Sequence, residues 1–569
     1  MCETPSLLPV APYPDEFAER YRKAGMWVDE TIPEFLETSC TDSAENLAVI
    51  AVSHQKMSQG ESDLVARLTY AELREQALLA AARVRDAGVR PGDRVLLQLP
   101  NIAEYLVYLL GIFWAGGIPV FCLPAHRASD LIHFAIKSDA SAHVFSSRTT
   151  GADFQQLHRS VASAVQDQQC RRLAGIDASL PYDTEKSESF TPAQPVINTD
   201  RTRKSEQVAF LQLSGGTTGL SKLIPRTHAD YLYSVRQSAK ICQLNQESTL
   251  LVVLPASHNF AMSSAGILGA IYTGSTIVFA ADPSPKTAFT LIEQEKVRVV
   301  QLVPPLAQAW LASAPKRQPN LETLELIQIG GAKLLPSVAE QITPVLHGKL
   351  QQVFGMAEGL VNYTRADDSD EMRLHTQGRP MSEFDEIRVV DDNDVPVAEG
   401  ESGHLLTRGP YTIRGYYNEP HINVKSFTED GFYRTGDIVR LHPTGDIEVT
   451  GRAKDQINRN GEKIAVDEIE DVALTHPHVY DAVAVGLPDE AVGERIYLVV
   501  VPQPDADFGE SPVSAMREYF AERQVTPYKF PELVEVMDAL PLTNVGKISR
   551  RDVRAAVLDH VLQNKENHA

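Results

Sequence analysis

The sequence predicts an α/β protein with a large N-terminal domain of two helix-covered, mostly parallel sheets, a small β-barrel-like subdomain and a small α+β C-terminal domain. Between residues 94 and 330, short β-rich runs alternate with helical patterns, which is typical of parallel sheets covered by helices. From about residue 384 the strands become short and alternating with tight turns, which indicates an antiparallel sheet or barrel. After Gly451 a charged, turn-like segment leads into a compact α+β sequence. We therefore expect an N-terminal domain over residues 1–451, with the β-rich subdomain at about 384–451, and a C-terminal domain over 452–569.

The β-rich runs of the first region occur in a fixed order along the chain. They are RVLLQL, IPVFCL, AHVFSS, QVAFLQLS, TLLVVLPA, STIVFA, VRVVQLVP and LELIQIGG. A polar interval from roughly 165 to 205 interrupts them and lacks periodicity. We expect this interval to be a long connection between the two sheet layers.

One nearly uncharged stretch, YLVYLLGIFWAGGIPVFCLP at residues 105–124, is about long enough to cross a bilayer. Its internal Gly-Gly pair and proline argue against a membrane span. The pattern favours a buried helix that ends near Gly116, followed by a buried strand from Ile118 to Leu123.

Bulk composition limits the function classes. A chain of 569 residues exceeds one hydrophobic core, so two or more domains are expected. The formal charge of −22 and the lack of a long basic run argue against a nucleic-acid partner. Five widely spaced cysteines without a C-x-x-C pair, and an N-terminus with acids and prolines in place of a signal peptide, favour a reducing cytoplasm.

The stretch LQLSGGTTGLSKLIPRTH, residues 211–228, carries glycines, hydroxyls and a lysine after an apolar run. Its spacing does not fit a Walker A loop, which needs G-x-x-x-x-G-K-[ST]. Glycines that admit close backbone approach, hydroxyl donors and a cation still suit a polyphosphate. Composition alone leaves two interpretations open, a phosphate cradle or a flexible hairpin turn.

Five motifs in order resolve this ambiguity: SGGTTGLSK at 214–222, QVFGMAEG at 352–359, YRTGD at 433–437, GRAKDQI at 451–457 and PLTNVGKI at 541–548. In this order they resemble the adenylate-forming enzyme superfamily, over nearly the whole chain. The segments PYPDEFAERYRKAGMW, LPASHNFAMSS, FGMAEGLVNYTR, TQGRPMSEFDEIRVVDD and LLTRGPYTIRGYY look like the stand-alone aryl-acid AMP ligases of siderophore pathways. That branch joins an aryl carboxylate to AMP and passes it to the phosphopantetheine thiol of an aryl carrier protein.

The resemblance implies a site for ATP and Mg²⁺. Glu358 would bind Mg²⁺ directly or through water, and Asp437 would accept hydrogen bonds from the ribose hydroxyls, with Arg452 nearby. A solvated acid in a turn is the alternative for Glu358, and a core phenylalanine is the alternative for Phe354, which would pack on adenine. The implied phosphate and adenine residues are Ser214, Gly215, Gly216, Thr217, Thr218, Gly219, Lys222, Gly330, Gly331, Ala332, Val353 and Phe354.

The resemblance also implies a two-step reaction served by a mobile C-terminal domain. Lys547 would contact the aryl carboxylate and the α-phosphate and stabilise the charge of the transition state. Lys454 would be the hinge about which the domain rotates, and Gly461 would line the thiol passage. Without its motif, a lysine near a C-terminus would be read as merely exposed.

The aryl-acid pocket implied by the resemblance contains His258, Asn259, Phe260, Ser264, Ala357 and Val361. Asn259 would bond the 2-hydroxyl of the acid, although a buried structural asparagine is the alternative. Ser264 and Val361 match the pattern for 2,3-dihydroxybenzoate, whereas Phe260 matches the salicylate pattern. The sequence therefore favours 2,3-dihydroxybenzoate, with salicylate and 3-hydroxypicolinate as alternatives.

Two rival functions remain at this stage. An aryl-CoA ligase would hand its adenylate to free CoA and should carry a basic or adenine-binding patch for the CoA nucleotide, which the sequence does not reveal. A catalytically silent docking partner of a carrier protein should have lost at least one of the phosphate loop, Glu358, Asp437 and Lys547, all of which are present.

Overall fold

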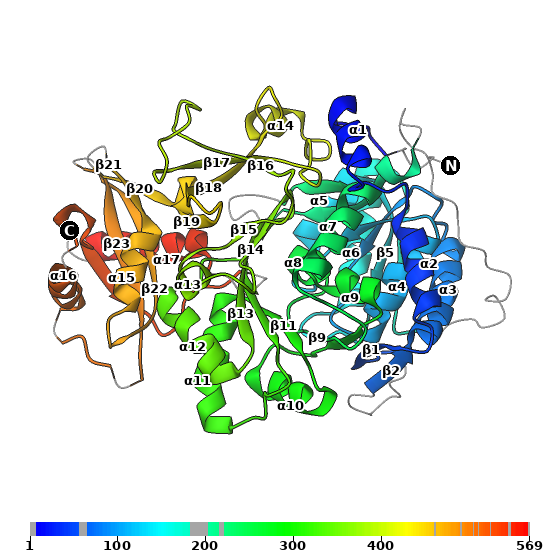
Figure 1. The fold of residues 1–569 in the computed structure, drawn as a ribbon, viewed down its shortest axis with the longest axis horizontal. Coiled ribbons are helices and arrows are strands. Elements are labelled where there is room, and N and C mark those ends of the chain that lie inside the picture. The colour runs from blue at the N-terminus through cyan, green and yellow to red at the C-terminus, as the bar shows by residue number, and fades with distance from the viewer. Residues whose placement is uncertain are drawn as a thin grey trace.

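The computed structural model describes residues 7–55, 65–181, 203–214, 221–459, 462–489, 492–504, 506–509, 511–523, 525–543 and 548–566. The molecule contains four sheets, and the N-terminal elements lie at one end and the C-terminal elements at the other (Figure 1). Two of them belong to the predicted large α/β part.

A six-stranded sheet has the order β6-β5-β3-β4-β7-β8 and is parallel except for the antiparallel β7–β8 pair. Apolar side chains on both faces of its central strands explain why helices cover it on both sides. Its strands are β3 (Arg94–Leu97), β4 (Ile118–Phe121), β5 (Ala140–Phe145), β6 (Ala174–Asp177), β7 (Val208–Leu213) and β8 (Leu223–Thr227), and α5 (Ala128–Ser138) and α6 (Phe154–Gln169) share a core with it.

A nine-stranded sheet has the order β15-β14-β13-β12-β11-β9-β10-β1-β2. All neighbouring strands from β13 to β1 in this order are parallel. Its edges are antiparallel, where β2 pairs with β1, β14 with β13, and β15 with β14. Its strands are β1 (Leu47–Val52), β2 (Val65–Thr69), β9 (Thr249–Val252), β10 (Thr276–Phe279), β11 (Val299–Leu302), β12 (Leu326–Gly330), β13 (Lys349–Met356), β14 (Gly359–Tyr363) and β15 (Arg379–Pro380).

Helices fill the space between these two sheets and cover the outer face of the larger one (Figure 1). The central helix α4 (Ala103–Trp114) contacts β3 and β4 of one sheet and β1 of the other, and all of its residues are buried. Its apolar run therefore serves an interior helix, as predicted, and β4 follows as the predicted strand. The other helices of this part are α1 (Asp15–Lys23), α2 (Ile32–Asp42), α3 (Tyr70–Asp86), α7 (His228–Ile241), α8 (Asn259–Ser263), α9 (Ile267–Thr273), α10 (Pro285–Glu295), α11 (Pro304–Arg317), α12 (Pro336–Leu346), α13 (Asp370–His375) and the 3-10 turn η2 (Lys204–Glu206).

The expectation that residues 165–205 connect the two layers is wrong. Strand β6 lies inside this interval, and β7 and β8, which follow it, join the same six-stranded sheet. The chain instead passes to the nine-stranded sheet after β8, through α7. A strand of four residues in a polar context gives no clear periodic signal, and its place in a sheet depends on partners far away in sequence.

The β-rich region from about 384 forms a four-stranded antiparallel sheet with the order β16-β17-β18-β19. Its strands are β16 (Glu386–Val390), β17 (Ser402–Arg408), β18 (Tyr433–Leu441) and β19 (Ile447–Arg452), with α14 (Pro420–Ser426) between β17 and β18.

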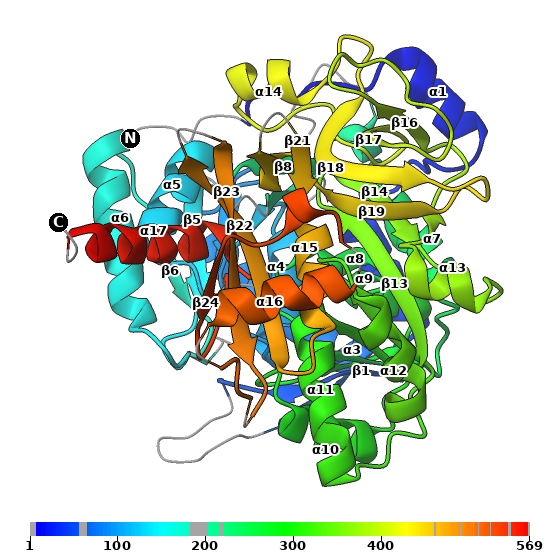
Figure 2. The same ribbon diagram turned by 90° about the vertical axis from the view of Figure 1, so that its left-hand side faces the viewer.

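A five-stranded sheet begins at Gln456, four residues after β19 ends at Arg452. It carries α15 and α16 with one apolar core and α17 with another (Figure 2). Its elements are β20 (Gln456–Arg459), β21 (Glu462–Ala465), α15 (Val466–Leu474), β22 (Val479–Asp489), β23 (Gly493–Pro502), α16 (Pro512–Glu522), η4 (Pro527–Lys529), β24 (Leu533–Val536) and α17 (Arg550–Glu566), preceded by η3 (Ala453–Asp455).

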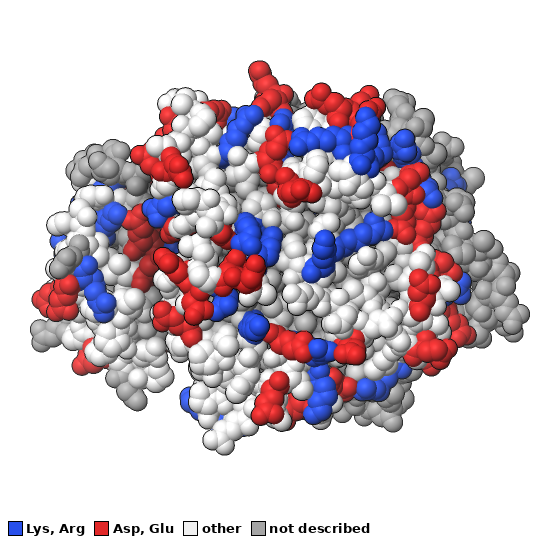
Figure 3. All heavy atoms as spheres, in the orientation of Figure 1, with Lys and Arg blue, Asp and Glu red and all other residues white. Residues whose placement is uncertain are grey.

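Acidic and basic side chains are interspersed on the face drawn in Figure 3. Ion pairs join segments of the molecule that are separate in sequence, such as Arg298 with Glu325 and Arg434 with Asp394. Within the described ranges, the structure contains no helix that is both long and apolar enough to span a membrane.

Candidate active site

The predicted phosphate stretch closes the β7–β8 hairpin. Ser214 and Lys222 face each other at its base: the Ser214 N–H donates to the Lys222 carbonyl and the Lys222 N–H donates to the Ser214 hydroxyl, both at 2.9 Å. This pairing extends the antiparallel register of Leu213 with Leu223. The predicted residues Gly215, Gly216, Thr217, Thr218 and Gly219 lie outside the described residues.

The predicted adenine residues lie at the carboxyl ends of neighbouring strands β12 and β13, where Gly330 pairs with Val353. A Cβ at Gly330 would lie 2.5 Å from the Val353 carbonyl oxygen and 3.2 Å from Cζ of Phe260, so only glycine fits. Ligands of α/β sheets bind at such carboxyl ends. Val353, predicted to bind the nucleotide, and Phe260, predicted to bind the aryl acid, therefore both border Gly330.

The neighbours of Gly330 also fit a shallow slot. Gly331 adopts a left-handed conformation with φ of 85°, which glycine tolerates without strain. Ala332, the next residue, is exposed. Phe354 is half-buried and packs against the small core of Leu360 and the four-stranded sheet, so one part of its ring surface is left outside that core.

Ala357 and Glu358 form the turn between β13 and β14, and Gly359 is the first residue of β14. The Glu358 carbonyl accepts the Ile413 N–H at 2.8 Å. A Cβ at Gly359, where φ is 128°, would lie 2.4 Å from Cα of Thr412, so the turn fits closely against the segment after β17. The Ala357 carbonyl accepts Nη1 of the buried Arg226 at 2.8 Å. These contacts hold the turn rigidly between two sheets.

The Glu358 side chain is buried and meets two phenols. The Tyr416 hydroxyl donates to Oε1 of Glu358 at 2.7 Å, and the Tyr433 hydroxyl lies 2.9 Å from that of Tyr416. Nζ of Lys222 lies 4.3 Å from the centroid of the Tyr416 ring. Burial, and after it the charge of Glu358, raises the pKa of both phenols, so both remain protonated at neutral pH.

This donor set fits a magnesium ion that arrives with a nucleotide. A buried carboxylate is a hard oxygen ligand, and Mg²⁺ is commonly held by one or two carboxylates together with phosphate oxygens. Across the ranges that the structure describes, no cluster of three His, Cys, Asp or Glu side chains could hold a metal by itself. Glu358 would therefore need phosphate oxygens as further ligands.

Asp437 and Arg452 pair across strands β18 and β19. Their Cα atoms are register partners, and Oδ1 of Asp437 lies 3.0 Å from Nε of Arg452. The Asp437 N–H donates to the Thr435 hydroxyl at 3.0 Å. Burial raises the pKa of Asp437 above its usual value, and the Arg452 guanidinium opposes that rise. A buried carboxylate with a neighbouring cation suits the predicted contact with two hydroxyl groups.

The predicted aryl-acid residues lie around the short helix α8. His258 caps its N-terminus, since its Nδ1 accepts the Phe260 N–H at 3.2 Å. Oδ1 of Asn259 accepts the hydroxyl of Tyr231 on α7 at 3.0 Å. The Gln301 amide donates to the carbonyls of Phe260 and Ser264 at 3.0 and 2.8 Å, so β11 fixes both ends of α8.

The other wall of this pocket is set by β14. The Val361 N–H donates to the Tyr411 hydroxyl at 3.1 Å, and this hydroxyl donates to Oδ2 of Asp385 at 2.6 Å. Val361 itself is buried in the same core as Phe260 and Val353. Ser264 is buried as well. Burial raises the pKa of Tyr363, and hydrogen bonding to the Ser238 and Ser264 hydroxyls opposes that rise.

Of the residues predicted for the second step, the structure describes only the backbone of Lys454. Lys547 and Gly461 lie outside the described residues, and Lys454 belongs to η3, with its side chain outside them. Three residues after Lys547, Arg550 is described: it pairs with Asp467 and Glu470 of α15. The start of α17, just after the motif of the predicted lysine, is thus tied to the first helix of the C-terminal part.

Sequence reasoning missed three side chains that build this site. Tyr231 contacts Asn259, Tyr416 contacts Glu358 and Lys222, and Nζ of Lys333 lies 3.0 Å from Oδ2 of Asp471 on α15. Burial alone would lower the pKa of Lys333, but the Asp471 carboxylate raises it above its usual value. The sequence gives only a weak signal for two of these residues, since Lys333 directly follows the predicted adenine segment GGA and Tyr416 lies in the segment RGYY.

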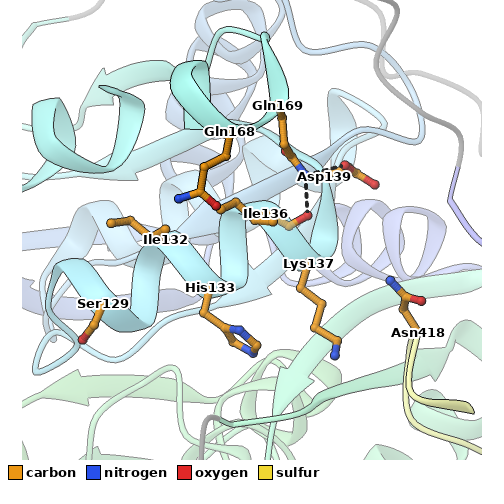
Figure 4. A pocket seen from close by; sticks show the side chains of 9 residues that line it. All are labelled: Ser129, Ile132, His133, Ile136, Lys137, Asp139, Gln168, Gln169 and Asn418. Atoms are coloured by element: carbon orange, nitrogen blue, oxygen red, sulfur yellow. Dashed lines mark hydrogen bonds between the residues drawn. The ribbon is translucent and has the colours of Figure 1, made fainter. Parts of the chain in front are cut away.

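An open depression of about 580 Å³ lies on α5, at the end of α6 and before α14 (Figure 4), and its lining residue His133 interacts with the backbone of Ser221 in the predicted phosphate stretch. The predicted ATP and aryl-acid residues come from other elements, at the strand ends and turns given above. The depression is lined by Ser129, Ile132, His133, Ile136, Lys137, Asp139, Gln168, Gln169 and Asn418.

Comparison with known proteins places this site in a family. The AMP-binding enzyme model matches residues 37–417, and the model for the AMP-binding enzyme C-terminal domain matches residues 468–547. The chain is 44% identical to the 2,3-dihydroxybenzoate-AMP ligase of Bacillus subtilis, over 97% of this chain and 98% of that protein. It is 41% identical to the salicyl-AMP ligase / salicyl-S-ArCP synthetase of Mycobacterium tuberculosis, over 95% of this chain and 93% of that protein.

Solved structures agree. The apo structure of MbtA from Mycobacterium smegmatis matches with a TM-score of 0.69 at 40% identity, over 96% of this chain and 98% of that chain. The two family models, the near-full-length relatives and the solved structure all match this chain over both its N-terminal and its C-terminal part. The chain therefore belongs to the family of AMP-binding enzymes.

Proposed function

We propose that this protein activates 2,3-dihydroxybenzoate with ATP to give the aryl-AMP and pyrophosphate, and then transfers the aryl group to the phosphopantetheine thiol of an aryl carrier protein in siderophore biosynthesis. Family membership implies the use of ATP. The observation that carries the proposal is the contact at Gly330, where Val353 of the nucleotide set and Phe260 of the aryl set border the same glycine. Two substrates held next to one strand end can react with each other.

In the first step, a carboxylate oxygen of the acid attacks the α-phosphorus, and the bond from that phosphorus to the bridging oxygen of the β-phosphate breaks. The chain supplies no nucleophile for this displacement; its residues bind and orient the reactants. We assign Asp437 to the ribose, Gly330, Gly331, Ala332 and Phe354 to adenine, and residues 214–222 to the departing phosphates. Lys547 would stabilise the charge that develops between the two reacting groups.

Glu358 would hold Mg²⁺ together with phosphate oxygens, and the ion would neutralise part of the triphosphate charge when bound. The buried carboxylate and the neighbouring Lys222 ammonium support this assignment, since both are fixed by contacts to Tyr416.

In the second step, the thiol sulfur attacks the aryl carbonyl, the bond to the AMP oxygen breaks and the thiol proton is released. We propose that residues 452–569 form a C-terminal domain that turns about Lys454 between the two steps, against an N-terminal domain of residues 1–451, and that Gly461 lines the thiol passage. The change from the four-stranded to the five-stranded sheet between Arg452 and Gln456 supports this hinge position. We also propose a cytoplasmic location, which suits the free thiols of Cys40, Cys122, Cys170 and Cys242.

One experiment tests reaction class and substrate together. Pyrophosphate–ATP exchange is measured with 2,3-dihydroxybenzoate, salicylate, 3-hydroxypicolinate and unsubstituted benzoate. We expect the highest kcat/KM with 2,3-dihydroxybenzoate. A higher value with salicylate or 3-hydroxypicolinate would overturn the substrate, and no exchange with any aryl acid would leave a silent docking protein. Replacement of the carrier protein by free CoA then separates the carrier-dependent ligase from an aryl-CoA ligase.

A further inference from the structure

Tyr416 lies where three predicted nucleotide-binding motifs meet. Its hydroxyl donates to Glu358 of the β13–β14 turn, its ring faces the Lys222 ammonium of the β7–β8 hairpin, and its hydroxyl contacts Tyr433, which begins the YRTGD motif. The three motifs belong to three different sheets. One side chain therefore links the parts of the site assigned to metal, phosphate and ribose.

The direction of the hydrogen bonds follows from the proton count. A phenol has one proton, and Tyr416 uses it on Oε1 of Glu358. We therefore assign the Tyr433 hydroxyl as the donor in its 2.9 Å contact with Tyr416, and Tyr433 also interacts with Glu358 itself. The result is a chain from Tyr433 through Tyr416 to the carboxylate. A hydrogen bond to an ionised acceptor is stronger than one between neutral groups, so this chain holds the carboxylate oxygen firmly.

The backbone of Tyr416 is equally fixed. Its N–H donates to Oδ1 of Asn423 at 2.8 Å, and its carbonyl accepts Nδ2 of the same side chain at 3.0 Å. Three residues earlier, the Ile413 N–H binds the Glu358 carbonyl. The phenol and the carboxylate therefore belong to one rigid unit, and the phenol can orient the carboxylate.

The Tyr416 ring also fixes a cation. The Lys222 Nζ lies 4.3 Å from the ring centroid, a distance at which the ring quadrupole attracts an ammonium. Lys222 is anchored at its other end by the backbone contact with Ser214. The ring thus keeps the ammonium close to Glu358, so that an anionic phosphate and its metal can be bound side by side.

We infer that Tyr416 is a positioning residue that orients Glu358 and Lys222 for metal-bound ATP, and that Tyr433 supports it. This inference rests on the proposed function of the site, since it assumes that Glu358 and Lys222 receive the metal and the phosphates. It assigns to the RGYY segment a role in nucleotide binding, beyond packing under the four-stranded sheet.

The test is calorimetric binding in the absence of aryl acid, with the purified full-length chain. Tyr416→Phe removes the hydroxyl and keeps the ring; Tyr416→Leu removes both. We expect Tyr416→Phe to weaken the binding of ATP in Mg²⁺ about 10-fold, because a hydrogen bond to a charged group is lost. With EDTA in place of Mg²⁺ the loss should shrink to about threefold or less, and AMP affinity should stay within about twofold. Tyr416→Leu should lose more than Tyr416→Phe in both media, because Lys222 is released.

Tyr70→Phe is the matched control, because the buried Tyr70 hydroxyl donates to the Ser275 carbonyl at 2.7 Å and lies away from the site. It should bind ATP like the wild type. Unchanged binding of magnesium-bound ATP by Tyr416→Phe, or equal losses for ATP, AMP and aryl acid, would overturn the inference. If Tyr416→Phe does not fold, Tyr433→Phe removes the supporting donor, and its ATP affinity in Mg²⁺ must fall more than its AMP affinity.

The two proposals fail separately. A metal-dependent loss in Tyr416→Phe together with no exchange for any aryl acid would keep the positioning role and refute the ligase reaction. Normal exchange in the wild type with unchanged ATP binding by Tyr416→Phe would keep the ligase reaction and refute the positioning role.

Discussion

Oδ1 of Asp437 lies 3.0 Å from Nε of Arg452, across the last two strands of the four-stranded sheet. The carboxylate is buried, whereas the arginine side chain is 49% exposed. The arginine can therefore move aside while the carboxylate stays in place to accept two hydroxyl groups. Arg452 is also the last residue before the short helix η3 that leads to the five-stranded sheet, so the pair links the predicted ribose contact to the predicted hinge.

Asp437→Asn should raise the KM for ATP by about 10-fold or more, because one charged acceptor for the ribose hydroxyls becomes a neutral donor. The KM for the aryl acid should stay within about twofold. Steady-state pyrophosphate exchange at varied ATP measures both. Arg452→Gln is the control for loss of the ion pair alone: if it matches Asp437→Asn, the ion pair and not the ribose contact explains the effect.

Ser264→Cys should lower the preference for 2,3-dihydroxybenzoate over salicylate by about 10-fold or more in kcat/KM. The buried Ser264 hydroxyl is proposed to pair with the 3-hydroxyl of the acid, and a lost buried hydrogen bond costs roughly 1–3 kcal/mol. Exchange assays with both acids give the ratio. Ser275→Cys changes a buried serine whose hydroxyl donates to the Asn245 carbonyl at 2.7 Å, outside α8, and should leave the ratio nearly unchanged; an equal shift there would refute the specific role.

Lys454→Pro should spare adenylation and slow aryl transfer to the carrier protein about 10-fold or more. Lys454 lies in the 3-10 turn η3. The usual φ of a 3-10 turn, about −60°, is one that proline can adopt, but proline cannot follow a rotation that changes φ at this residue. Lys454→Ala retains torsional freedom and should behave like the wild type in both steps. Single-turnover transfer of preformed aryl-AMP provides the measurement, and equal losses in adenylation and transfer would contradict a hinge.

Asp385→Asn should change stability in a pH-dependent way. Burial raises the pKa of Asp385 to about 7, and hydrogen bonds from Tyr411 and Ser382 only partly oppose the rise. An aspartate in the unfolded chain titrates near 4, so the folded state alone keeps the proton between about pH 4 and pH 7. The contribution of Asp385 to the free energy of unfolding must therefore fall as the pH rises through this window.

Asparagine does not titrate, so the stability advantage of the wild type over Asp385→Asn should shrink from pH 5 to pH 8. Urea unfolding at pH 5, 6.5 and 8 measures the difference. Asp394→Asn, at an exposed ion pair with Arg434, should show no such trend over this range. A difference for Asp385→Asn that does not vary with pH would contradict an ionisation of this carboxyl near neutrality.

The sequence predicts those parts of the fold whose signal is local. The apolar run of α4 and the strand after it are recognisable because burial on all sides removes polar residues from both elements. The assignment of β6 to its sheet is not local. This strand is recognised only through its pairing with β5, between Ala142 and Ala174, so the polar interval around it led to a wrong boundary.

The same distinction holds for the site. Glu358 and Asp437 lie in short motifs whose residue types match their chemistry, and the structure places both carboxylates in buried, polar surroundings. Tyr416 lies 58 residues from the carboxylate that it contacts, and Asp471 lies 138 residues from Lys333. Such pairs depend on how separate sheets pack against one another, and the spacing of residues in a sequence motif does not predict that packing.

The meeting of Lys222, Glu358 and Tyr433 at Tyr416 has a practical consequence for splitting the gene into two pieces. A cut near residue 384 leaves Lys222 and Glu358 on the first fragment and both phenols on the second. Neither fragment could then assemble the proposed triphosphate site on its own, whereas the two fragments bound to each other could. Nucleotide binding by such a split pair would report fragment complementation, which makes the loop before β16 a suitable position for a two-part biosensor.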